Sequence, residues 1–94
     1  MSIVIIGGNE CMVRRYKELC REYRCKAKVY TKMSRGLENM GCPDLLILFT
    51  NTISHKMVHC ALSETKGQNV CIARSHTSSM SALKNILETH VAGN

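Results

Sequence analysis

The sequence has no tryptophan, only one proline, and no apolar segment near the roughly 20 residues that a membrane-spanning helix needs. The apolar start at residues 3–6 has no basic leader and is too short for a secretory signal peptide, so we expect a cytoplasmic protein without a membrane partner. With 45% hydrophobic and 21% charged residues, the composition excludes a linker or a disordered tail. A chain of 94 residues is expected to form one domain, residues 1–94, with a small core.

The six cysteines include no CxxC pair, which removes the spacing of a zinc knuckle or a thioredoxin-type dithiol. Without an export signal we expect reduced thiols rather than disulfides. Three of them fall within predicted regular elements, where a small buried hydrophobe is expected: Cys20, Cys60 and Cys71.

Predicted strands alternate with predicted helices along the whole chain. The strands are residues 2–6, 26–31, 44–49 and 70–73, and the first two helices are residues 11–24 and 53–66. Thr77, Ser78 and Ser79 are candidate caps of a last helix, whose apolar stripe is Met80, Leu83, Ile86 and Leu87. The first and third strands are continuous apolar runs, typical of strands buried on both faces, whereas the second alternates and should be more exposed. Residues 33–40 are expected to be an irregular or weakly helical crossover, and Thr50, Asn51 and Thr52 are candidate N-caps of the middle helix. This order predicts an α/β fold with a small four-stranded parallel sheet, Rossmann-like or flavodoxin-like, in strand order 2-1-3-4.

Polar residues follow the first, third and fourth strands, where ligands bind in open parallel sheets. We expect a ligand site there formed by Gly7, Gly8, Asn9, Glu10, Thr52, Ser54, His55, Arg74, Ser75, His76, Thr77, Ser78 and Ser79. Arg74 with a hydroxyl-rich helix start suits a phosphate or carboxylate, so the leading hypothesis is a non-enzymatic binding or sensor module for a small anion. The alternatives are that the hydroxyls only cap the helix and that the two glycines only form a tight turn. Classical NAD binding is excluded, because Met12 replaces the third glycine and the second strand ends without an acidic residue.

Histidines supply a second hypothesis, a haem or transition-metal protein. His55 and His59 form an HxxxH pair, but His59 should point away from the apolar helix face, toward solvent or a partner subunit. His55 lies in the first helical turn and could meet His76 as a metal ligand. Two cysteines are further candidate ligands, Cys11 and Cys42, the latter in a Cys-Pro dipeptide; Cys11 is also a candidate nucleophile for a third hypothesis, an enzyme.

Basic residues are concentrated in one stretch, which holds nine of the thirteen lysines and arginines, from Arg14 to Arg35. Such a stretch can bind nucleic acid, a fourth hypothesis. The alternative is a solvated charged face, which the scarcity of aromatic side chains for base stacking favours.

Several of these segments resemble one bacterial family. The strand followed by Gly7-Gly8, the Ser54-His55 pair and the Arg74-Ser75-His76 run are similar to the domain-of-unknown-function family numbered 2325. The resemblance implies a small cytosolic bacterial α/β protein and brings no activity. Relatives often carry histidine after the two glycines, whereas this chain has Asn9, which weakens any metal site that depends on a third imidazole.

We also expect a symmetric oligomer, most simply a homodimer. A four-stranded parallel sheet leaves unpaired backbone on both edges. Apolar side chains such as Met57, Val58 and Met80 exceed what so small a core is expected to bury.

Overall fold

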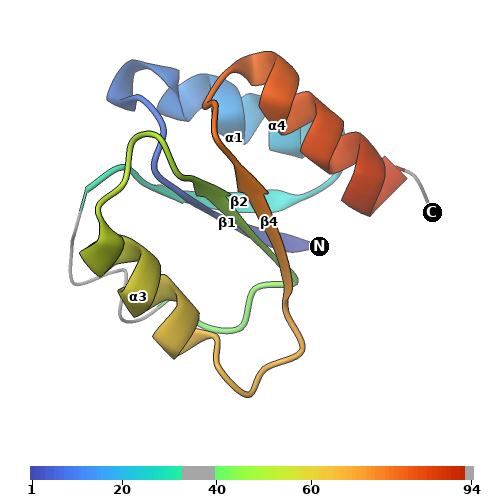
Figure 1. Cartoon of the computed structure of the whole chain (residues 1–94). Helices are drawn as coiled ribbons and strands as arrows, with labels where there is room; N and C mark the ends of the chain where they lie inside the picture. Colours follow the sequence, from blue (N-terminus) through green and yellow to red (C-terminus); the bar gives the residue numbers. More distant parts are fainter. Residues whose placement is uncertain (33–39, 93–94) are drawn as a thin grey trace.

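The computed structural model describes residues 1–32 and 40–92 and confirms the predicted α/β architecture (Figure 1). Its sheet is all-parallel, in the order β2-β1-β3-β4. The strands are β1 (Ser2–Ile6), β2 (Lys26–Tyr30), β3 (Leu45–Phe49) and β4 (Cys71–Ser75). The predicted crossover at residues 33–40 lies outside the described residues except for Met40, which is buried.

Helices cover both faces of the sheet. After β1, the short turn η1 (Glu10–Met12) leads into α1 (Val13–Glu22), and α4 (Met80–Leu87) continues into η2 (Glu88–Ala92). These elements pack on one face, whereas α3 (His55–Glu64) packs on the other (Figure 1). The side-chain alternation of the strands divides the core accordingly, with Ile5 and Ile47 under α1 and α4, and Ile6 and Leu48 under α3. No helix in the described ranges is long and apolar enough to cross a lipid bilayer.

The two central strands and the two edge strands differ in burial. All five residues of β3 are buried, and so are the last four of β1, as their continuous apolar runs predict. The β2 edge is more exposed, also as predicted, but the β4 edge is exposed as well: 43% of Ile72 is accessible. The prediction of three buried cysteines is therefore wrong for Cys71, which is exposed at the start of β4, and only partly right for Cys60.

The start of α3 differs from its prediction. Ser54 is the N-cap, accepting a hydrogen bond from the Met57 amide, and the helix begins at His55. The threonines before it form the turn after β3 instead, because the hydroxyls of Thr50 and Thr52 both donate to backbone carbonyls. Met57 itself is only 4% exposed, so the expectation that the core could not cover it is wrong; Val58 and Met80 are half-buried.

Candidate ligand site at the carboxyl edge of the sheet

Hydrogen bonds join the three segments that follow β1, β3 and β4. The Gly8 amide donates to the Thr52 hydroxyl at 2.7 Å, which links the first segment to the second. The amide and the hydroxyl of Thr50 both donate to the Ser75 carbonyl, at 2.9 and 3.3 Å, which links the second segment to the third. Figure 1 shows the ends of these strands and the starts of α1 and α4 gathered at one edge of the sheet. The segments are thus neighbours in space, as predicted.

Packing explains both glycines after β1. Gly7 and Gly8 have φ values of +98° and +88°, a backbone conformation that residues with a side chain rarely adopt. A Cβ atom at Gly7 would lie 2.5 Å from the Ile53 side chain, and one at Gly8 would lie 2.7 Å from the ring of Tyr16. Gly7 is buried beneath these neighbours. The observed geometry favours the tight-turn interpretation over close approach of a ligand to this backbone.

Tyr16 is a structural residue of this edge that the sequence analysis missed. Its ring is fully buried against Phe49, with centroids 5.6 Å apart, and its hydroxyl donates to the Ser78 carbonyl at 2.6 Å. This bond fixes α1 to the loop before α4. The sequence did contain a signal for this role, a tyrosine on the apolar stripe of a predicted helix. A buried tyrosine hydroxyl usually has a hydrogen-bond partner.

Asn9 and Glu10 make local contacts. The Asn9 side-chain oxygen accepts hydrogen bonds from the amide and the thiol of Cys11, at 3.2 and 2.8 Å, and so caps η1. The Glu10 carboxylate forms an ion pair with Lys32 at 2.9 Å. Both residues lie at the carboxyl edge, as predicted, but their polar atoms already have protein partners.

Hydroxyl groups before α4 also bind backbone. The Ser79 hydroxyl caps α4 by accepting from the Ala82 amide, and the Ser75 hydroxyl donates to the Thr77 carbonyl at 2.7 Å. Ser79 therefore has the capping role that the alternative interpretation predicts, as Ser54 does at α3, whereas the Ser75 hydroxyl binds loop backbone and does not cap the helix. Both helix starts nevertheless lie at the same edge of the sheet.

Arg74 is the charged group of the edge. It is exposed, and no ion pair of its guanidinium occurs within residues 1–32 and 40–92. Arg74 is in register with Leu48, which lies under α3, whereas the preceding Ala73 packs under α1 and α4. Arg74 therefore extends from the α3 face, while α4 begins on the opposite face. A ligand lying across the ends of β3 and β4 would be contacted from both faces.

The candidate metal ligands are not gathered into a cluster. Among the residues that the structure describes, no group of three or more His, Cys, Asp or Glu could hold a metal ion. His55 and His76 are both exposed at the carboxyl edge, as is Cys11. Cys42 precedes β3 and so lies at the amino ends of the strands. A five-residue strand separates it from the carboxyl edge by about 16 Å, which is too far for Cys42 to share an ion with His55, His76 or Cys11. The haem and metal hypothesis remains a prediction.

Comparisons with known proteins identify one relationship. A family model described as "Uncharacterized protein conserved in bacteria (DUF2325)" matches residues 2–90, which is nearly the whole chain. No curated protein and no solved structure gives a significant match.

Proposed function

We propose that the chain, which belongs to this DUF2325 family of uncharacterized bacterial proteins, is a binding or sensor module that holds a small anionic ligand at the carboxyl edge of its sheet. One observation carries the proposal: three polar segments, distant in sequence, are hydrogen-bonded together at the point where the strand order reverses. Arg74, exposed and without an acidic partner in the described residues, supplies the charge.

The edge offers an anion two kinds of attraction. The N-termini of α3 and α4, capped by Ser54 and Ser79, carry the positive ends of the helix dipoles. The Arg74 guanidinium adds a full charge and can donate two parallel hydrogen bonds to a phosphate or carboxylate. His55 and His76 are exposed at the same edge and can add contacts to such a ligand.

Ligand-dependent thermal unfolding tests the proposal. Inorganic phosphate, nucleoside phosphates and small carboxylates are each titrated, and at 100 times its Kd a bound ligand stabilises the fold by about 2.7 kcal/mol. At least one should raise the Tm of the parent protein and of the control Lys84→Ala, which removes an exposed charge from α4. The same ligand should not raise the Tm of Arg74→Ala. If no ligand shifts the Tm, or Arg74→Ala responds like the parent, the proposal fails.

We further propose that the protein works in the bacterial cytoplasm as a homodimer that associates through β4. The supporting observation is the difference between the two sheet edges. Lys26 and Lys28 blunt the β2 edge, whereas the β4 edge exposes Ile72. Light scattering should give twice the chain mass for the parent and a monomer for Ile72→Glu. A mass near 10.5 kDa at all concentrations would contradict the dimer.

A further inference from the structure

The net charge of the protein resides in one fifth of the chain. Residues 13–32, which form α1, the following turn and β2, contain eight basic and two acidic residues, a net charge of +6. The whole chain also has a net charge of +6, so the remaining residues are neutral in sum. The net positive charge is therefore supplied by this one segment of the chain.

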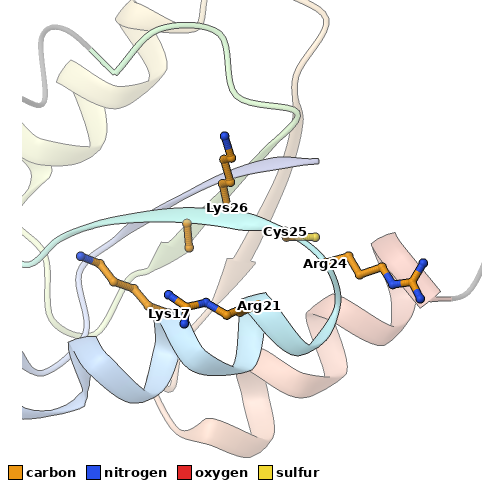
Figure 2. Close-up of a pocket in the computed structure, with 6 residues that line it drawn as sticks. Lys17, Arg21, Arg24, Cys25 and Lys26 are labelled. Carbon is orange, nitrogen blue, oxygen red and sulfur yellow. The ribbon is translucent and has the colours of Figure 1, made fainter.

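Two grooves are lined largely by this segment. The first has a volume of about 470 Å³ and is lined by Lys17, Arg21, Arg24, Cys25, Lys26 and Ala27. Figure 2 shows Lys17 and Arg21 on α1, below β2, and Arg24 in the turn that joins α1 to β2. Lys26 extends from β2 on the side away from α1. The second groove, of about 530 Å³, shares Lys17 and Arg21 and is otherwise lined by Glu10, Val13, Arg14 and Glu18, so it is of mixed charge. The basic surface is defined as Lys17, Arg21, Arg24 and Lys26, the four cations that line the first groove.

The cations of the basic surface are not neutralised by the protein. In the described part of the chain the ion pairs are Arg14 with Glu18 and Lys32 with Glu10, and neither includes one of these four residues. Lys17 and Arg21 are one helical turn apart, a like-charge arrangement that destabilises a helix by a few tenths of a kcal/mol. The basic surface therefore keeps its unpaired charge although the Lys17–Arg21 pair lowers the stability of α1.

The backbone conformation of Arg24 also lowers the stability of the fold. It is the one non-glycine residue with positive φ, 60°, in the described ranges 1–32 and 40–92. It occupies the position after the end of α1 where glycine is usual, with its amide bonded to Arg21 and the next amide, of Cys25, bonded to Cys20. A side chain in this left-handed conformation costs about 1–2 kcal/mol. A position where glycine would be more stable instead carries a cation that lines the groove.

We infer that the basic surface binds the phosphate backbone of double-stranded nucleic acid without selecting a sequence. Four lysines and arginines that have no ion-pair partner in the described residues, and that come from a helix, a turn and a strand, suit a polyanion better than a single small anion. Among the described residues that line the two grooves there is no aromatic side chain, whereas proteins that hold single strands stack bases on aromatic rings. The inference goes beyond the proposed function, since Arg24 and Lys26 lie at the amino end of β2 and Arg74 lies at the carboxyl end of β4.

Fluorescence anisotropy with labelled duplexes, measured between 50 and 200 mM salt, tests the inference. Four phosphate contacts predict a slope of about −3 to −4 in the plot of log K against log salt, which is about a 100-fold loss of affinity over this range. The double variant Lys17→Gln with Arg21→Gln should bind more weakly and lower the slope by about 2. The matched control is Lys56→Gln with Lys66→Gln, which removes two exposed charges elsewhere and should leave the slope unchanged. Duplex DNA and duplex RNA are compared as separate arms.

Arg24→Gly tests binding with a variant that is not expected to destabilise the fold. It relieves backbone strain, so it should stay folded by circular dichroism while lowering the salt slope by about 1. Several results would overturn the inference: no binding to either duplex at 25 mM salt, equal losses in the test and control doubles, tighter binding to single strands, or tighter binding to anionic phospholipid vesicles. Arg74→Ala should not change duplex affinity, which separates this outcome from that of the proposed anion site.

Discussion

Replacing Arg24 with glycine should stabilise the protein, which is unusual for a single substitution. The residue is held at φ 60° by the two hydrogen bonds that end α1, each 2.9 Å long. Glycine removes a steric cost of about 1–2 kcal/mol but loses about 0.5–1 kcal/mol more backbone entropy on folding. The two ranges give a net gain of about 0–1.5 kcal/mol, and the central value of about 0.75 kcal/mol raises the Tm by about 3–6 °C in a domain of this size.

Urea denaturation of Arg24→Gly and Arg24→Ala separates the backbone effect from the charge effect. Alanine removes the same charge but retains a Cβ atom, so Arg24→Ala should be no more stable than the parent. The reasoning is refuted if Arg24→Gly is no more stable than Arg24→Ala. An equal gain in both variants would assign the effect to relief of repulsion among the neighbouring cations instead.

Three further predictions concern the core. Gly8→Ala should lower the free energy of unfolding by about 2–4 kcal/mol, because the new Cβ is strained at φ +88° and meets the Tyr16 ring at 2.7 Å; an unchanged urea midpoint would contradict this packing. Tyr16→Phe removes the hydrogen bond to the Ser78 carbonyl and should cost about 1 kcal/mol by the same assay, and no loss would show that the bond does not contribute. Burial and the neighbouring Cys25 raise the pKa of the Cys20 thiol from 9.0 to about 11, so the folded state favours the neutral thiol. Stability from this group should be complete below about pH 9 and be lost as the pH rises toward 11; Cys20→Ala should flatten that decline, and identical pH profiles for the two proteins would contradict the assignment.

The order and type of the elements could be predicted because local patterns determine them. The apolar runs of β1 and β3 can only be buried on both faces, and that burial in turn places them at the centre of the sheet. The right-handed crossover rule then leaves few strand orders, and the predicted one is observed. The same logic placed the three polar segments at one edge, since the ends of parallel strands coincide.

The sequence could not determine which polar side-chain atoms already have hydrogen-bond partners within the protein. Ser54 rather than a preceding threonine caps α3, and Asn9 binds Cys11, because backbone amides and carbonyls compete for each side chain at distances that only the folded chain sets. The burial of Cys71 was predicted wrongly for a related reason, since only the folded chain places Cys71 at the start of a strand that lies at the edge of the sheet, where it is exposed.

By itself, the sequence determined the fold class, the strand order and the edge of the sheet where the three polar segments meet, through periodicities that act over a few residues. Tertiary structure alone decided that Tyr16 packs on Gly8 and bonds to Ser78, and that Arg24 closes α1 in a left-handed conformation beside Lys17 and Arg21. These contacts join residues on separate elements, and their energies depend on distances and backbone angles that local sequence patterns do not encode.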